Sequence, residues 1–270
     1  MLPQGAGRQR RSRRWGSKAA RRTTARACSS RRSTSGASVE RALRGAEGAY
    51  LLLPPDPSSD DFVAPGRRIA GNFAAALRKS PVRHAVLLSS VGAALPSGTG
   101  PIVTAHEAER ALGAVKTTAF TFLRAAYFME NLLAYAHAMR ADGVLPVFGG
   151  GGGHALPMVA TADIGEVAAA ALLAPPAATE VVDLSGPREY SFDDAAREAS
   201  ALLGRPVRAV DLPIEGLVPA LTGFGVSPNV AGLYRERTEA LGAGRVRPEG
   251  VGRAVRGKTE LGAVLGAALR

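Results

Sequence analysis

The chain has 270 residues, 46% of them hydrophobic, which is enough for one large domain with a buried core or for two small ones. Its formal net charge of +11 is confined to one segment. Residues 1–32 hold eleven basic residues and no acidic one, whereas 23 basic and 23 acidic residues balance in the remainder. A basic footprint spread over a folded face is therefore excluded, and nucleic acid is not an expected partner.

Cysteine usage and hydropathy indicate the compartment. The single cysteine, Cys28, excludes an internal disulfide, and no apolar run reaches the roughly 18 residues of a membrane-spanning helix. The first residues lack the apolar core of a secretory signal. We therefore expect a cytoplasmic protein with no membrane partner. No two histidines share metal-ligand spacing with a carboxylate or with Cys28, so no metal site is expected.

Apolar runs alternate with amphipathic segments from residue 38 onwards. The spacing predicts a helix with Ser38 as its N-cap, and then, in chain order, strand 48–56, helix 64–80, strand 83–93, helix 103–115, strand 119–128 and helix 129–141. Such alternation is typical of a parallel sheet covered by helices. Right-handed crossovers would bring the strand ends to one edge, where ligands bind in such folds. We expect the segments at Pro54–Pro55, Ser89–Ser90 and Arg124–Tyr127 to line one crevice there.

The second half of the chain has a less regular pattern. Residues 144–174 predict a turn-rich ribbon and then a helix from Asp163, with Asp163 and Glu166 at capping-box spacing. A strand at 180–186, a helix at 191–205 capped by Ser191 and a strand at 206–213 follow. We expect these later elements to form a small α/β subdomain that closes over the crevice.

Known phosphate-binding patterns are missing or incomplete. Neither G-x-G-x-x-G nor G-x-x-G-x-x-G occurs, and the run Gly149–Gly153 predicts a flexible hairpin. No tyrosine is followed four residues later by lysine, so the Tyr-x-x-x-Lys pair is also missing. Residues 252–259, GRAVRGKT, match G-x-x-x-x-G-K-[ST], but a poor strand precedes them and only 11 residues follow. We interpret this match as chance.

Three positions carry polar groups suited to a ligand. His106, on the helix after the second strand, could donate a hydrogen bond or act as a general acid, or be an ordinary helical histidine. Ser89 and Ser90 could bind a ligand or cap the next segment. A nucleophilic role is not favoured, because no G-x-S-x-G elbow surrounds them. Arg124 could pair with a phosphate or carboxylate, or form a structural ion pair.

Four blocks of sequence together resemble one family: HAVLLSSVGA, SGTGPIVTAHEAERAL, TFLRAAYFMENLL and VATADIGEVAAAAL. Over residues 38–220 the chain resembles the NmrA-like, atypical short-chain dehydrogenase/reductases. The resemblance implies a Rossmann-type α/β fold that binds NADP or NAD and reduces a quinone-like or other small acceptor. A dinucleotide-sensing protein without turnover, and a nucleic-acid-associated protein that uses the basic arm, are the alternatives.

The resemblance also implies where the cofactor lies. It puts eight residues beside the nicotinamide half: Pro54, Ser89, Ser90, His106, Arg124, Ala125, Tyr127 and Phe128. His106 falls where relatives carry a Lys or His facing the cofactor, so it is the candidate catalytic residue.

The N-terminus departs from the family pattern. Relatives begin with a strand, a T-G-A-T-G-x-x-G turn that holds the pyrophosphate, and further strand–helix units. Here residues 1–36 occupy that place, and their composition predicts disorder. We therefore expect these units to be missing or disrupted and cofactor binding to be impaired. The domain would span residues 37–240, with the substrate subdomain mainly from 186, and residues 241–270 receive no place in it.

Four interpretations of the basic segment stay open. It could be an arm for nucleic acid or an anionic surface, a transit peptide, a mis-started or out-of-frame translation, or a disordered extension. The chain has 34 basic residues, of which only four are lysine, which indicates GC-rich DNA. Such DNA read in a wrong frame yields Arg, Ala, Gly and Ser, so the third interpretation accounts for both the composition and the missing units.

Overall fold

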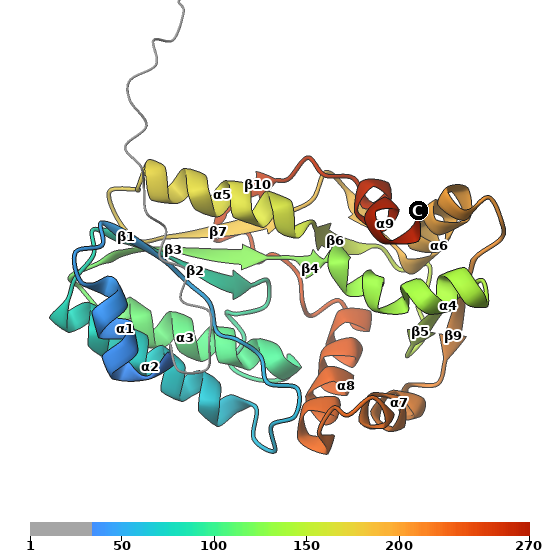
Figure 1. The fold of residues 1–270 in the computed structure, drawn as a ribbon, viewed down its shortest axis with the longest axis horizontal. Coiled ribbons are helices and arrows are strands. Elements are labelled where there is room, and N and C mark those ends of the chain that lie inside the picture. The colour runs from blue at the N-terminus through green and yellow to red at the C-terminus, as the bar shows by residue number, and fades with distance from the viewer. Residues whose placement is uncertain (1–33) are drawn as a thin grey trace, which may run out of the picture.

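The computed structural model describes residues 34–270, so the expectation for residues 1–36 falls almost wholly outside the described residues. Figure 1 shows a larger lobe built on a central sheet and a smaller lobe beside it. The larger lobe holds, in chain order, α1 (Gly36–Leu43), β1 (Gly48–Leu51), α2 (Val63–Lys79), β2 (His84–Ser90), η2 (Gly100–Ile102), α3 (Val103–Gly113), β3 (Ala119–Ala125), α5 (Thr161–Leu173), β7 (Glu180–Ser185) and β10 (Arg253–Arg256).

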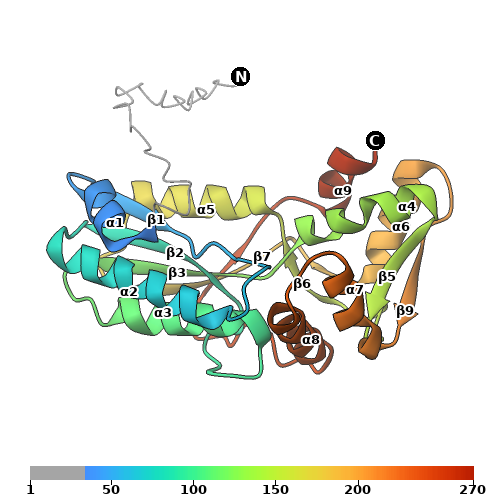
Figure 2. The same cartoon turned by 60° about the horizontal axis from the view of Figure 1, so that its bottom comes forward.

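The central sheet is parallel throughout. Its strand order is β1-β2-β3-β7-β10, and every pair of neighbours runs in the same direction. Helices α1, α2 and α3 lie on one face and α5 on the other (Figures 1 and 2). The predicted Rossmann-type sheet with helices on both faces is confirmed. Among the described residues, β1 has a neighbour on one side only.

The apolar run of β2 shows why this sheet forms. Leu87 packs with the residues of α2 and α3, whereas Val86 packs with the cluster that includes Ile164 of α5. Both side chains are completely buried. Successive residues of a strand point to opposite faces, so a strand covered on both sides needs a continuous apolar run.

The smaller lobe holds β4 (Tyr127–Phe128), η3 (Met129–Tyr135), α4 (Ala136–Ala141), β5 (Val144–Phe148), β6 (Leu156–Val159), β8 (Glu189–Tyr190), α6 (Phe192–Leu203), β9 (Arg208–Leu212), η4 (Ile214–Gly216), α7 (Leu217–Gly223), α8 (Pro228–Gly242) and α9 (Leu261–Leu269). Two small sheets, β4-β6-β8 and β5-β9, support it. Much of its core lies between α6, α9 and η3.

The ribbon predicted for residues 144–174 is wrong. β5 pairs in parallel with β9, and β6 pairs with β4 and β8, so the two strands belong to different sheets. Three successive glycines, Gly149 to Gly151, have φ between 72° and 98° and carry the chain from one sheet to the other. Alternating hydrophobicity does not reveal which strand a given strand will pair with.

Two predicted helix starts are also wrong. The N-cap of α1 is Ser35, whose hydroxyl accepts a hydrogen bond from the Ser38 N–H, so Ser38 lies in the first turn. Helix α5 begins at Thr161, and Asp163 forms no capping box. Its carboxylate instead accepts hydrogen bonds from the Thr259 N–H (3.0 Å) and hydroxyl (2.8 Å).

The C-terminal residues complete both lobes. Within the GRAVRGKT match, Arg253–Arg256 is strand β10, whereas a phosphate-binding loop requires irregular backbone there. After it, the Gly257 N–H donates to the Ser185 carbonyl, and Lys258 pairs with Glu166 at 2.9 Å. Helix α9 then packs into the core of the smaller lobe. Residues 241–270, which the sequence left without a place, are therefore part of the fold.

Candidate functional site

The strands β1, β2 and β3 end at one edge of the central sheet, which faces the smaller lobe (Figure 1). The three strands are adjacent and parallel, and Ser89 and Ser90 at the end of β2 lie opposite Arg124 and Ala125 of β3. Pro54 follows β1 by three residues. The prediction that these strands lie side by side and point the same way is confirmed. That all three segments line one crevice stays a prediction.

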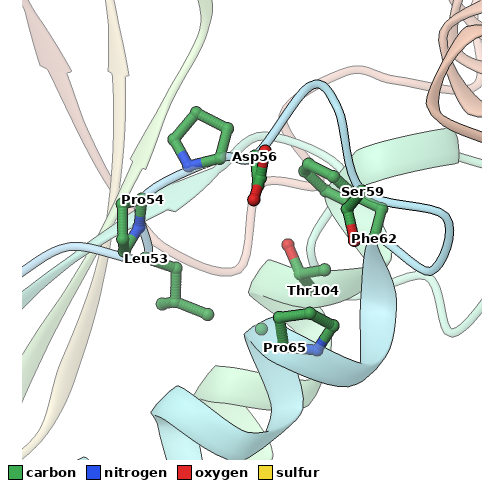
Figure 3. Close-up of a pocket in the computed structure, with 9 residues that line it drawn as sticks. Leu53, Pro54, Asp56, Ser59, Phe62, Pro65 and Thr104 are labelled. Atoms are coloured by element: carbon green, nitrogen blue, oxygen red, sulfur yellow. The ribbon is translucent and has the colours of Figure 1, made fainter. Parts of the chain in front are cut away.

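A small pocket opens at the tip of β1. Its volume is about 30 Å³, and Pro54, Asp56 and Phe62 line it together with Leu53, Pro55, Ser59, Pro65, Gly66 and Thr104. Figure 3 shows the Asp56 and Thr104 side chains pointing toward each other across it. Ligand pockets typically measure about 300–1,000 Å³. This pocket is therefore large enough for a few atoms but not for a dinucleotide.

A buried charge pair lies behind the edge. Arg124 donates from Nε to Glu109 Oε1 at 3.0 Å and from Nη2 to Glu109 Oε2 at 2.7 Å, and the Ser89 hydroxyl donates to Glu109 Oε1 at 2.5 Å. The Arg124 side chain is 8% exposed and that of Glu109 is 10% exposed. The hydrogen bonds from Arg124 to Glu109 raise the pKa of Arg124 above its usual value.

Two further carboxylates surround Arg124. Its Nη1 donates to Glu249 at 3.0 Å, and Asp183 lies opposite it on β7. Of the two alternatives left open for Arg124, the structure therefore contains the ion pair. Sequence reasoning missed Glu109, because a buried glutamate on an amphipathic helix has no signal that separates it from exposed ones.

His106 is held by the loop that follows β2. Its Nδ1 lies 2.8 Å from the carbonyl oxygen of Ala93. A carbonyl only accepts, so Nδ1 carries the proton and the lone pair of the neutral ring is on Nε2. The ring is half-buried. The backbone thus sets the tautomer and orientation of the one candidate proton donor.

The strand predicted at 119–128 is divided between the lobes. β3 ends at Ala125, the Ala126 N–H donates to the Leu184 carbonyl, and β4 then joins the sheet of the smaller lobe. Tyr127 on β4 packs edge-to-face on Phe192 at 6.2 Å. The predicted residues Tyr127 and Phe128 therefore lie where the chain crosses from one lobe to the other.

An arginine of α8 lies against the tyrosines at this crossing. The Arg237 guanidinium is 4.6 Å from the ring centre of Tyr234 and 5.8 Å from that of Tyr127. Burial raises the pKa of the Tyr127 and Tyr135 phenols, and the charge of Arg237 opposes this shift at both. No sequence signal pointed to α8, because it lies outside the segments in which predicted strands and helices alternate.

Two solved structures with the same fold are reductases bound to NADPH or NADP(H). The NADPH-dependent quinone oxidoreductase of Escherichia coli, solved with NADPH, superposes with a TM-score of 0.71 at 22% identity, over 87% of this chain and 80% of that one. The Citrobacter triphenylmethane reductase, solved with NADP(H), gives 0.71 at 19% identity, over 87% and 81%. The fold is shared with these reductases, as the resemblance to the NmrA-like, atypical short-chain dehydrogenase/reductases implied. No family model matches the chain.

Two curated proteins that the chain is similar to are reductases as well. The NAD(P)H azoreductase of Xenophilus azovorans is 29% identical over 197 residues, which cover 72% of this chain and 65% of the relative. The (4-alkanoyl-5-oxo-2,5-dihydrofuran-3-yl)methyl phosphate reductase of Streptomyces griseus is 28% identical over 203 residues, or 75% and 68%. The chain thus spans about two thirds of the length of these relatives.

The described residues contain neither a membrane-spanning helix nor a cluster of metal ligands. In residues 34–270, no helix has the length and hydrophobicity to cross a membrane. Within the same residues, no group of three or more His, Cys, Asp or Glu side chains is placed to hold a metal ion.

Proposed function

We propose that the chain is a cytoplasmic NAD(P)H-dependent oxidoreductase that acts on a small acceptor such as a quinone or an azo compound. The observation that carries this proposal is the common edge of β1, β2 and β3, where parallel α/β folds bind their ligands. The names of the relatives, which include a quinone, an azo and a triphenylmethane reductase, support the same reaction class.

The residues at this edge fit the nicotinamide half of the cofactor. The exposed Pro54 and the half-buried Phe128 offer apolar surfaces, and His106 offers a ring nitrogen, whereas Ala125 is buried. A nicotinamide bound there would supply a hydride. The reduction of a quinone also consumes protons, and we propose that the protonated His106 ring donates one from Nε2.

The described residues fit the phosphate half poorly. In doubly wound sheets of order 3-2-1-4-5-6, the glycine-rich turn follows the first strand, which pairs with the fourth. We equate β1 with that fourth strand, so the first strand would pair with the open side of β1. Residues 34–270 contain no glycine-rich turn there, and the glycine run at 149–153 lies in the smaller lobe. Arg124 is already paired with Glu109 and Glu249. We therefore propose weak binding of the dinucleotide, in either its NADP or its NAD form.

One observation favours the alternative of a sensor without turnover. Ser89 and Arg124 both donate hydrogen bonds to Glu109, so these donors are not free to bind a substrate. His106 is then the single proposed proton donor at the edge, so loss of its role would leave a site that binds but does not react.

The test is cofactor titration followed by turnover. We expect NADPH or NADH to change the intrinsic fluorescence with an affinity weaker than micromolar, and NADPH oxidation to require a quinone or azo acceptor. The variant His106→Ala should lower the rate by about 10²–10⁴-fold, the usual contribution of a general acid. His137→Ala, at an exposed position of α4, is the control. Binding without turnover would favour the sensor, and the absence of dinucleotide binding would refute both.

A further inference from the structure

Helix α8 brings Arg237 to the junction of the two lobes. Its last turn packs on the strand ends, with Ala240 in one cluster with Val91 and Ala126. Gly100 of η2 approaches α8 so closely that an added Cβ would lie 3.0 Å from the Arg237 Cβ. Figures 1 and 2 show α8 where the two lobes meet, beside α7. The base of the Arg237 side chain is therefore fixed beside the edge of β2 and β3.

The charge of Arg237 lacks a protein counter-ion. Its Nε is buried with no hydrogen-bond partner, and no carboxylate of residues 34–270 forms an ion pair with it. The guanidinium makes cation–π contacts with the rings of Tyr127 and Tyr234. By contrast, Arg124 of β3 forms ion pairs with two carboxylates, Glu109 and Glu249. Arg237 is half-buried, with its Nε fully buried. A counter-ion stabilises a partly desolvated cation, so Arg237 marks a place for an anion that the described residues do not supply.

The surroundings of Arg237 indicate the kind of anion. Tyr234 and Tyr127 lie against the guanidinium, and Tyr135 is within its electrostatic reach. Aromatic rings stack on flat aromatic ligands, and a guanidinium binds carboxylate-type oxygens in bidentate fashion. We propose that Arg237, Tyr127, Tyr135 and Tyr234 form an aromatic-anion subsite, which selects acceptors that carry a sulfonate or carboxylate on an aromatic system.

That the bound compound is reduced rests on the proposed function, whereas its binding at the aromatic-anion subsite does not. We therefore test binding first, by titration calorimetry in the absence of cofactor. Anthraquinone-2-sulfonate is the anionic probe, and 2-(hydroxymethyl)anthraquinone is the neutral one. The variants are Arg237→Met, Arg237→Lys and, as the matched control on the same helix, Arg235→Met, which removes an exposed partner of Glu239.

We expect Arg237→Met to weaken binding of the sulfonate at least tenfold and to leave that of the neutral quinone within about twofold. Arg237→Lys should restore part of the loss, and Arg235→Met should bind like the wild type. Unchanged sulfonate binding in Arg237→Met would overturn the proposal. An equal loss of affinity for the two quinones would also overturn it. So would a loss of affinity for NADPH without a loss of affinity for the sulfonate.

A wild-type experiment covers the case in which Arg237→Met does not fold. Benzenesulfonate should displace anthraquinone-2-sulfonate, and benzyl alcohol at the same concentration should not. Equal displacement by the two, or none by benzenesulfonate, would count against the aromatic-anion subsite. Normal sulfonate binding in a chain that never oxidises NADPH would reject only the proposed function.

Discussion

The bidentate pair between Arg124 and Glu109 is the most deeply buried charged contact of the candidate site. Breaking such a pair leaves a desolvated charge, which typically costs about 3–5 kcal/mol, whereas exposed pairs contribute about 0–1 kcal/mol. Arg124 keeps Glu249 and Asp183 nearby in Glu109→Ala, so we expect this variant to lose less than that full amount but more than an exposed pair contributes. Glu239→Ala, in the exposed pair with Arg235, is the control. Denaturant unfolding at pH 7 measures both, and similar small losses would show that Glu109 does not hold Arg124.

His84, at the start of β2, predicts how stability responds to pH. The ring is buried, with Nε2 3.0 Å from the Thr121 hydroxyl. Burial lowers the pKa of His84, and the charge of Glu180 opposes the shift only in part. The unfolded chain takes up this proton near pH 6.5, so it gains protons before the folded chain does. Stability that is present above about pH 6.5 is therefore lost as the pH falls from there through the lowered pKa.

The variant His84→Gln isolates this contribution. Between pH 7.5 and 5.5, we expect the free energy of unfolding to fall less steeply in His84→Gln than in the wild type. His137→Gln, at an exposed position, should keep the wild-type slope. Thermal or urea unfolding at several pH values gives the slopes. Identical slopes in all three proteins would mean that His84 is protonated in the fold as readily as in the unfolded chain.

Among the elements, α9 ties the C-terminus to the smaller lobe. Leu265 is completely buried against α6 and η3, and the Glu260 carboxylate before the helix accepts a hydrogen bond from Tyr190 at 2.5 Å. Truncation of a fully buried leucine typically costs about 2–5 kcal/mol. We expect that loss for Leu265→Ala. Leu173→Ala, at an 81% exposed position of α5, should change stability by less than about 0.5 kcal/mol.

Chemical denaturation of the two leucine variants decides whether the C-terminal segment belongs to the folded unit. If Leu265→Ala is as stable as Leu173→Ala, then α9 does not contribute to the core and the smaller lobe ends before it.

At the scale of the whole molecule, Gly100 controls how closely the lobes approach. Its φ is +61°, and an added Cβ would lie 2.0 Å from the Leu233 carbonyl oxygen of α8. Gly250 has a similar φ of +71° with nothing within 4 Å of the Cβ position. Both alanine variants bear the cost of a left-handed residue, about 1–2 kcal/mol. Only Gly100→Ala must also displace α8, so we expect it to lose more stability than Gly250→Ala.

Hydrogen–deuterium exchange gives a second measure of this contact. We expect faster exchange in α8 of Gly100→Ala and wild-type exchange there in Gly250→Ala. Because α8 carries Arg237, anthraquinone-2-sulfonate should also bind less tightly to Gly100→Ala. Equal stability and equal exchange in the two variants would show that the lobes do not depend on this approach.

The sequence by itself determined what local patterns encode. Apolar runs bounded by glycine and proline predicted the strands that became β1, β2 and β3, and the Ser191 side chain caps α6 as expected. These features depend on residues a few positions apart, so composition and spacing suffice to find them. The order of strands and helices then restricted the topology to a parallel sheet.

Only the tertiary structure decided which distant groups meet. Asp163 accepts its hydrogen bonds from Thr259, 96 positions further along the chain, and Arg124 is paired with Glu249, 125 positions away. The separation of β5 and β6 into different sheets and the placing of Arg237 beside Tyr127 are of the same kind. Such contacts depend on how whole elements pack, and a polar side chain has the same local sequence signal whether or not a partner comes to lie against it.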